Sequence, residues 1–212
     1  MKTPGRSDAA GLFLCPKPVF SLSEAGFAAR TPRSEHENQL ETVMRLFAAA
    51  LFVFAPAAIS MAAVPAPRVR AQSFDQLATP LPLPYDETAD ALRAVDRARA
   101  RAKAAHKLLL IDLGGNWCLD CRILAGTMDL PEVGAFLRRH YELVSVDVGR
   151  FDKNLAVPAR YGITQRLEGV PALLVVDPRA DRLINAGHVS ALADARSMSP
   201  QALADWLAQW PH

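Results

Sequence analysis

The chain has 212 residues, a formal net charge of +2, 50% hydrophobic residues and 22% charged residues. These proportions exclude a wholly disordered chain. The small net charge and the lack of a basic run with interleaved aromatic residues argue against nucleic-acid binding. Three cysteines are too few for a scaffold held together by disulfides.

The N-terminal part of the sequence predicts a secretory segment. Residues 1–43 are polar and charge-balanced, and we interpret them as an over-extended gene start without function. Residues 44–66 begin with Met44 and Arg45 and continue as an uncharged apolar run with small residues near its end. This pattern predicts a signal peptide, and a membrane anchor is the alternative, because about 20 apolar residues span a bilayer. We therefore expect a periplasmic or secreted protein, with membrane contact only through residues 46–66 if they are retained.

The rest of the chain divides into a linker and one domain. Residues 67–85 are rich in proline, and we interpret them as an extended linker. Residues 86–212 alternate between helical and strand-like patterns. Helices are expected over 86–105, 118–127, 131–139, 153–161 and 200–210, and strands over 108–113, 142–148, 172–176 and 182–186. This order predicts an α/β sandwich with a central mixed sheet.

A pair of cysteines stands where the first strand is expected to pass into a helix. Cys118 lies at the expected helix N-terminus, where unpaired N–H groups and the positive end of the dipole stabilise a thiolate. Cys121 follows one turn later, close enough to attack a mixed disulfide formed at the first sulfur. We therefore expect thiol–disulfide exchange, with Cys118 as the nucleophile and Cys121 as the resolving thiol.

Three other uses of the two sulfurs compete with exchange. A structural disulfide over so short a loop constrains the unfolded chain little. A zinc site lacks a second cysteine pair and suitably spaced histidines, whereas Cu(I) binding stays open because soft thiolates bind that ion. We expect neither a metal nor a small-molecule cofactor for exchange, and no part in it for Cys15.

Around the cysteine pair, residues 88–210 resemble thioredoxin-fold thiol:disulfide oxidoreductases. Asp112, on the strand before the pair, resembles the buried acid of that family, which implies that it accepts the proton of the resolving thiol. Trp117 resembles the tryptophan beside the first cysteine. Val170 and Pro171 resemble the cis-proline segment, which implies that Pro171 lies against the sulfurs and that the Val170 backbone pairs with a substrate. The resemblance thus assigns Trp117, Val170 and Pro171 to substrate binding.

Within this family, residues 112–121 and 129–133 most resemble secreted reductases such as the C-terminal domain of DsbD. That resemblance implies that the chain reduces disulfides of extracytoplasmic client proteins. It also implies a membrane or soluble thiol donor that restores the dithiol. The alternatives are a disulfide oxidase or isomerase, or a non-enzymatic Cu(I)-binding or client-binding protein of the same fold.

Four departures from the family pattern carry further expectations. Asp120 places an anion between the sulfurs, which opposes thiolate formation and favours a reducing couple, with Arg122 offsetting part of the charge. Ser145 stands where the family often has a lysine, so Asp112 should hold its proton tightly. Gly114-Gly115 predicts a more open rim, and residues 164–168 lengthen the segment before the proline and could shape a partner-binding rim.

Overall fold

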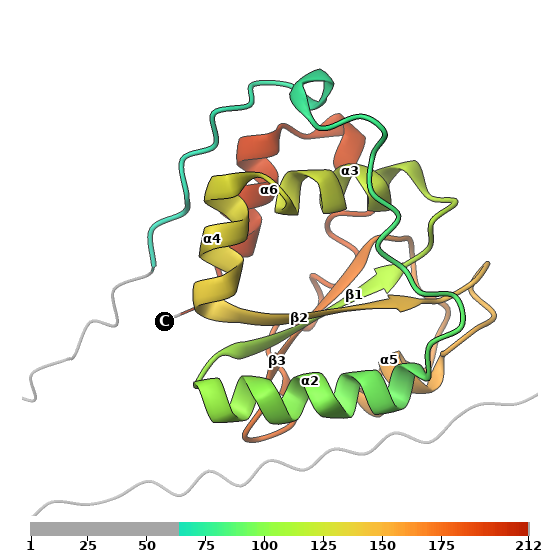
Figure 1. Cartoon of the computed structure of the whole chain (residues 1–212). Coiled ribbons are helices and arrows are strands. Elements are labelled where there is room, and N and C mark those ends of the chain that lie inside the picture. The colour runs from blue at the N-terminus through green and yellow to red at the C-terminus, as the bar shows by residue number, and fades with distance from the viewer. Residues whose placement is uncertain (1–63, 212) are drawn as a thin grey trace, which may run out of the picture. The chain divides into compact units, whose positions relative to one another are not determined.

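The computed structural model describes residues 64–211 of the chain (Figure 1). The expected gene-start segment and nearly all of the apolar run lie outside the described residues, so the signal peptide remains a prediction. Within residues 64–211, no helix has both the length and the apolar character needed to cross a membrane.

A sheet of four strands forms the centre of the domain, in the order β2-β1-β3-β4. Its strands are β1 (Leu108–Gly114), β2 (Tyr141–Asp147), β3 (Ala172–Asp177) and β4 (Arg182–Leu183). β2 runs parallel to β1, whereas β3 runs antiparallel to both β1 and β4. The expected mixed sheet is therefore confirmed. β1 is almost continuously apolar because it is central and helices cover both of its faces.

Helices cover the sheet on both sides (Figure 1). One side carries α2 (Ala91–Ala105) and α5 (Ala156–Arg160), and the other carries α3 (Leu119–Met128), α4 (Pro131–His140) and α6 (Pro200–Leu207). Single 3-10 turns form at η1 (Phe74–Gln76) and η2 (Ala195–Ser197). The buried side chains accordingly form two apolar clusters, one on each face. This arrangement is the α/β sandwich predicted from the sequence.

Four elements are shorter than expected. α6 ends at Leu207 and not at residue 210. α2 begins at Ala91 because the Asp90 side chain caps it by accepting from the Arg93 amide. α5 spans only five residues. β4 ends after Leu183, because the Asn185 side chain then replaces the backbone as partner of β3: its amide donates to Leu173 O at 2.8 Å and its oxygen accepts from Val175 N at 2.9 Å.

Residues 64–90, here called the N-terminal segment, are packed onto the domain. They include residues 67–85, which we expected to be a linker. The stretch is indeed mostly without helix or strand, but Val69 and Leu77 are buried in the cluster beside α3 and α6. Tyr85 is buried in the cluster on the other face. Proline keeps the backbone extended without preventing its apolar side chains from reaching the core, so the domain begins before residue 86.

Side chains of the domain hold this segment by hydrogen bonds, and two of them each bind it at two backbone groups. Arg122 on α3 donates to the carbonyl oxygens of Leu81 at 3.0 Å and Pro82 at 3.3 Å. Gln201 on α6 donates to Pro67 O at 3.1 Å and accepts from Val69 N at 2.8 Å. The segment passes over the α3–α6 layer and then beside the sheet to reach α2 on the opposite face (Figure 1). It therefore brings Tyr85 past the end of β1.

Candidate active site

The cysteine pair lies at the expected junction between β1 and α3. Cys118 is the N-cap of α3, and its Sγ accepts a hydrogen bond from Cys121 N at 3.2 Å. The two cysteines form a disulfide, with their Cα atoms 5.3 Å apart. Cys118 is 5% exposed and Cys121 is fully buried, so Cys118 carries the outer sulfur and Cys121 the inner one.

The Val170–Pro171 segment lies directly against the outer sulfur. The Val170–Pro171 peptide bond is cis. The carbonyl oxygen of Val170 stands 3.4 Å from Cys118 Sγ. Residues 52 positions apart in the chain therefore meet at the site as the family resemblance implied.

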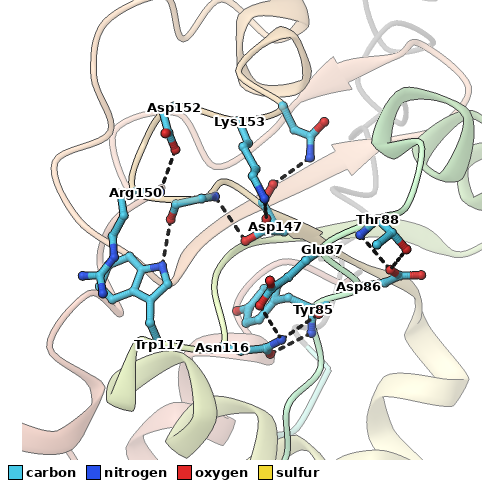
Figure 2. Close-up of polar contacts among 12 residues, drawn as sticks. Tyr85, Asp86, Glu87, Thr88, Asn116, Trp117, Asp147, Arg150, Asp152 and Lys153 are labelled. Carbon is cyan, nitrogen blue, oxygen red and sulfur yellow. Dashed lines mark hydrogen bonds and ion pairs between the residues drawn. The ribbon is translucent and has the colours of Figure 1, made fainter.

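Trp117 forms an exposed rim next to the outer sulfur. Its side chain is 42% exposed, and its indole N–H donates to Gly149 O at 2.8 Å (Figure 2). The Arg150 guanidinium stacks 4.2 Å from the centre of the ring, and the ring of Phe151 lies edge-on to it. Sequence reasoning identified Trp117 but not its two neighbours, because they follow β2 in a loop without a recognisable motif.

Asp112 lies behind the disulfide, on β1. It is 1% exposed, and burial raises the pKa of its carboxyl to about 7. Ser145 lies opposite it on β2, in the register expected for the family's lysine. Among residues 64–211, no lysine, arginine or histidine side chain hydrogen-bonds to this carboxyl. The expectation that Asp112 holds its proton tightly is thus confirmed in direction.

Tyr85 is the partner of Asp112, and sequence reasoning missed it. Its hydroxyl lies 2.9 Å from each carboxylate oxygen and donates to them. Asn116 holds the Tyr85 backbone in place, accepting from its N–H at 3.2 Å and donating to its carbonyl at 2.8 Å (Figure 2). An aromatic residue at the end of a proline-rich stretch was the only signal available.

Gly114, the last residue of β1, and Gly115 after it make close contacts possible, and the rim is not open as expected. A Cβ on Gly114 would lie 2.6 Å from Tyr85 Cζ and 2.8 Å from Cys121 Sγ. A Cβ on Gly115 would lie 2.9 Å from Trp117 Cδ1. Both glycines are buried, because aromatic side chains from elsewhere occupy the space that bulkier residues would fill.

Asp120 does not present a free charge to the sulfurs. It is 6% exposed, and Arg196 from η2 binds it with its backbone N–H at 2.9 Å and with its guanidinium, whose Nε lies 2.9 Å and 3.1 Å from the two oxygens. Burial alone would raise the pKa of this carboxyl, but the bonds from Arg196 lower it. The compensating cation is therefore Arg196 and not Arg122, which is bonded to the N-terminal segment.

The segment before Pro171 borders a hollow. Residues 165–168 line a cavity of about 220 Å³ together with Gly187, Val189 and Ser190. The Ser190 hydroxyl donates to Gly169 O, next to the cis peptide bond, at 3.4 Å. The extra residues thus adjoin the site, and their use in partner binding remains a prediction.

A metal site is not evident in the part of the chain that the structure describes. No three histidine, cysteine, aspartate or glutamate side chains gather within residues 64–211 in an arrangement that could hold a metal ion.

The chain was compared with protein-family models, curated proteins and solved structures. Residues 90–178 match the thioredoxin-like family model. A disulphide isomerase from Xylella fastidiosa Temecula1 is 40% identical over 60% of this chain and 96% of its own, with a TM-score of 0.55. A Pseudomonas aeruginosa protein of unknown function is 21% identical over 57% of this chain and 83% of its own, with a TM-score of 0.32. No curated protein matches the chain.

A redox-capable cysteine pair at the start of α3, facing a cis-proline on a mixed α/β sheet, defines a thiol:disulfide oxidoreductase. The chain belongs to the thioredoxin-like family. Proteins of this class act on disulfide-bearing substrates.

Proposed function

We propose that the protein reduces disulfides in extracytoplasmic client proteins. The observation that carries this proposal is the electrostatic setting of the cysteine pair. Among residues 64–211, no lysine, arginine or histidine side chain hydrogen-bonds to either sulfur, and the Asp112 carboxyl stands behind the inner one. The N-terminus of α3 therefore stabilises the Cys118 thiolate without help from a bonded cation. A dithiol whose thiolate is less stabilised has a lower reduction potential, and so it gives up electrons more readily.

The proposed reaction has two steps. Cys118 Sγ, as a thiolate, attacks one sulfur of the client disulfide, and the other client sulfur leaves with the electron pair of the broken bond. Cys121 then loses its proton to the Asp112 carboxylate and attacks Cys118 Sγ. This forms the Cys118–Cys121 disulfide and releases the second client thiolate. The client gains two electrons and the pair loses two.

The substrate would bind beside Cys118, at a surface formed by Trp117, Val170 and Pro171. The Val170 backbone offers hydrogen-bonding groups to an extended client strand beside the sulfur, while Pro171 itself has no N–H. Trp117 offers an exposed aromatic face on the other side. A membrane or soluble thiol donor would then restore the dithiol. The apolar run of residues 44–66 supports an extracytoplasmic site of action.

Disulfide isomerisation is the second candidate, because the 40% identical relative is described as a disulphide isomerase. An isomerase uses the same first step but lets another client thiol displace Cys118 before Cys121 resolves the complex. The two activities therefore differ in which thiol attacks the mixed disulfide, and not in the architecture of the site.

The equilibrium reduction potential tests the direction of electron flow. It would be measured in glutathione and dithiothreitol buffers on the full chain carrying Cys15→Ser, so that the pair contributes the only thiols. We expect a value near that of thioredoxin, about −270 mV, whereas a value near about −120 mV would overturn the proposal in favour of an oxidase. Turnover of a scrambled-disulfide protein without net reduction, lost in Cys118→Ser, would favour isomerisation.

A further inference from the structure

We propose that Tyr85 is a positioning residue for thiol exchange, because its hydroxyl keeps the Asp112 carboxyl in the ionised form that takes the proton of Cys121. This inference rests on exchange at the Cys118–Cys121 pair and not on the direction of electron flow. It assigns a functional part to the N-terminal segment, which lies outside the residues that match the family model.

The geometry brings three groups together from three distant parts of the chain. The Tyr85 hydroxyl is 2.9 Å from both oxygens of Asp112. Gly114 separates the phenol ring from the inner sulfur, since a Cβ there would collide with Tyr85 Cζ and Cys121 Sγ alike. The phenol therefore borders the same small space as the sulfur that must lose its proton. Asn116 fixes the backbone of Tyr85 on both sides.

The hydroxyl can act as a hydrogen-bond donor but not as an acid. Burial and the neighbouring Asp112 raise the pKa of Tyr85 far above its ordinary range, so it stays protonated throughout. Burial likewise raises the pKa of Asp112, whereas the bonds from Tyr85 and Ser145 lower it. Because a donated hydrogen bond favours the ionised carboxyl, Tyr85 offsets part of the cost of burying its charge.

Other charged groups near this site do not supply the same effect. Ser145 faces Asp112 from β2, and Cys121 on α3 borders the space beside Gly114 that the Tyr85 ring also borders. Asp147, at the end of β2, adds negative charge near Tyr85 and pairs with Lys153 at 3.4 Å. Leu173 lies opposite Asp112 on β3 and carries no charge. Tyr85 is thus a donor that contacts both carboxylate oxygens and also borders the space beside the inner sulfur.

Without the hydroxyl, Asp112 should remain protonated to higher pH. In the second step, the Cys121 S–H bond breaks, its proton moves to Asp112, and the sulfur forms a bond to Cys118 Sγ as the client thiolate leaves. A carboxyl that already carries a proton cannot accept this one. Removing Tyr85's hydroxyl should therefore slow resolution at neutral pH and leave the first step unchanged.

Dithio-bis-nitrobenzoate separates the two steps, because each releases one coloured thionitrobenzoate. The reduced full chain carrying Cys15→Ser would be mixed with one equivalent of the reagent at a series of pH values. In Tyr85→Phe, we expect the midpoint of the second phase to move up by about one to two pH units, and the first phase to keep its pH profile. Asp112→Asn, alone or combined with Tyr85→Phe, should abolish the midpoint in the pH profile of the second phase.

Tyr141→Phe is the matched control, because Tyr141 is also buried and donates its hydroxyl, at 2.7 Å, to the remote Leu207 O. It should leave both phases as in the parent. If Tyr85→Phe does not fold, a ring-fluorinated tyrosine at position 85 retains the packing and strengthens the donor, and it should move the midpoint to lower pH.

An unchanged midpoint in Tyr85→Phe, or in the fluorinated protein, would overturn the inference, as would a slower second phase whose pH profile is unaltered. Release of a single equivalent by the parent would instead show that the pair does not exchange. That result contradicts thiol exchange itself, so the two failures are distinguishable.

Discussion

Asp112 should make the oxidised protein less stable as the pH rises, and Asp112→Asn should remove that dependence. The carboxyl titrates at about 7 in the folded protein against 3.8 in an ordinary setting. Between these two pKa values the folded state holds a proton that the unfolded state has released. The contribution of this proton to the free energy of unfolding is therefore complete below the lower pKa, and it is lost as the pH rises through the higher one. At 1.36 kcal/mol per pKa unit, the loss is about 4 kcal/mol.

The assay is urea unfolding of the oxidised full chain, parent against Asp112→Asn, from about pH 4 to about pH 8. The substituted amide keeps an acceptor for the Tyr85 hydroxyl, so its own cost is the same at every pH. The difference in unfolding free energy between the two proteins should therefore grow by about 4 kcal/mol in favour of the variant across that range. A difference that stays constant, or one that grows in favour of the parent, would refute a raised pKa at Asp112.

Three further outcomes follow from contacts around the site. Gly114→Ala should lower the free energy of unfolding in urea by about 1–3 kcal/mol, since the new methyl group would collide with the buried Tyr85 ring and Cys121 Sγ. Gly126→Ala is the control and should change this free energy little, because its methyl group would lie 3.3 Å from the ends of the Leu77 and Leu81 side chains. Arg196→Met should unmask the Asp120 charge and make the reduction potential more negative, and adding Asp120→Asn should cancel that shift. Asn185→Ala should cost about 2–5 kcal/mol, because two buried backbone groups of β3 lose their partners; an unchanged urea midpoint would contradict this.

Most of the sheet and its helices could be predicted because the patterns that specify them are local. The apolar run of β1, the Ser199 cap and the prolines at the start of α4 and α6 are all visible within a few residues. Element ends were less accurate because they depend on distant partners. β4 is short because the Asn185 side chain, and not the backbone, bonds to β3 after Leu183. No periodic pattern in the sequence marks the point where this side chain replaces the backbone.

The candidate site divides in the same way. The cysteine pair, the cis-proline and the position of Ser145 opposite Asp112 follow from short motifs placed in family-like order. Arg196 could not be predicted, because it reaches Asp120 across 76 positions from a turn without a motif. Because Arg196 neutralises Asp120, this carboxylate favours a reducing couple less than expected. What favours a reductant is the Asp112 carboxyl and the lack of a cation bonded to either sulfur within residues 64–211.

The N-terminal segment shows why composition misled the assignment of the domain boundary. Proline predicts an extended backbone, and the segment is extended, but an extended chain with apolar side chains at intervals can still bury them against helices. Gly126 on α3 faces this segment closely enough that a Cβ there would lie 3.3 Å from both Leu77 Cδ1 and Leu81 Cδ2. The contact ends at Tyr85, where the segment supplies the hydroxyl for a buried carboxyl that has no cationic partner among the described residues. A domain defined from the family match alone would begin at residue 90 and omit that hydroxyl, so the chemistry of Cys121 depends on a part of the chain that its motif does not reveal.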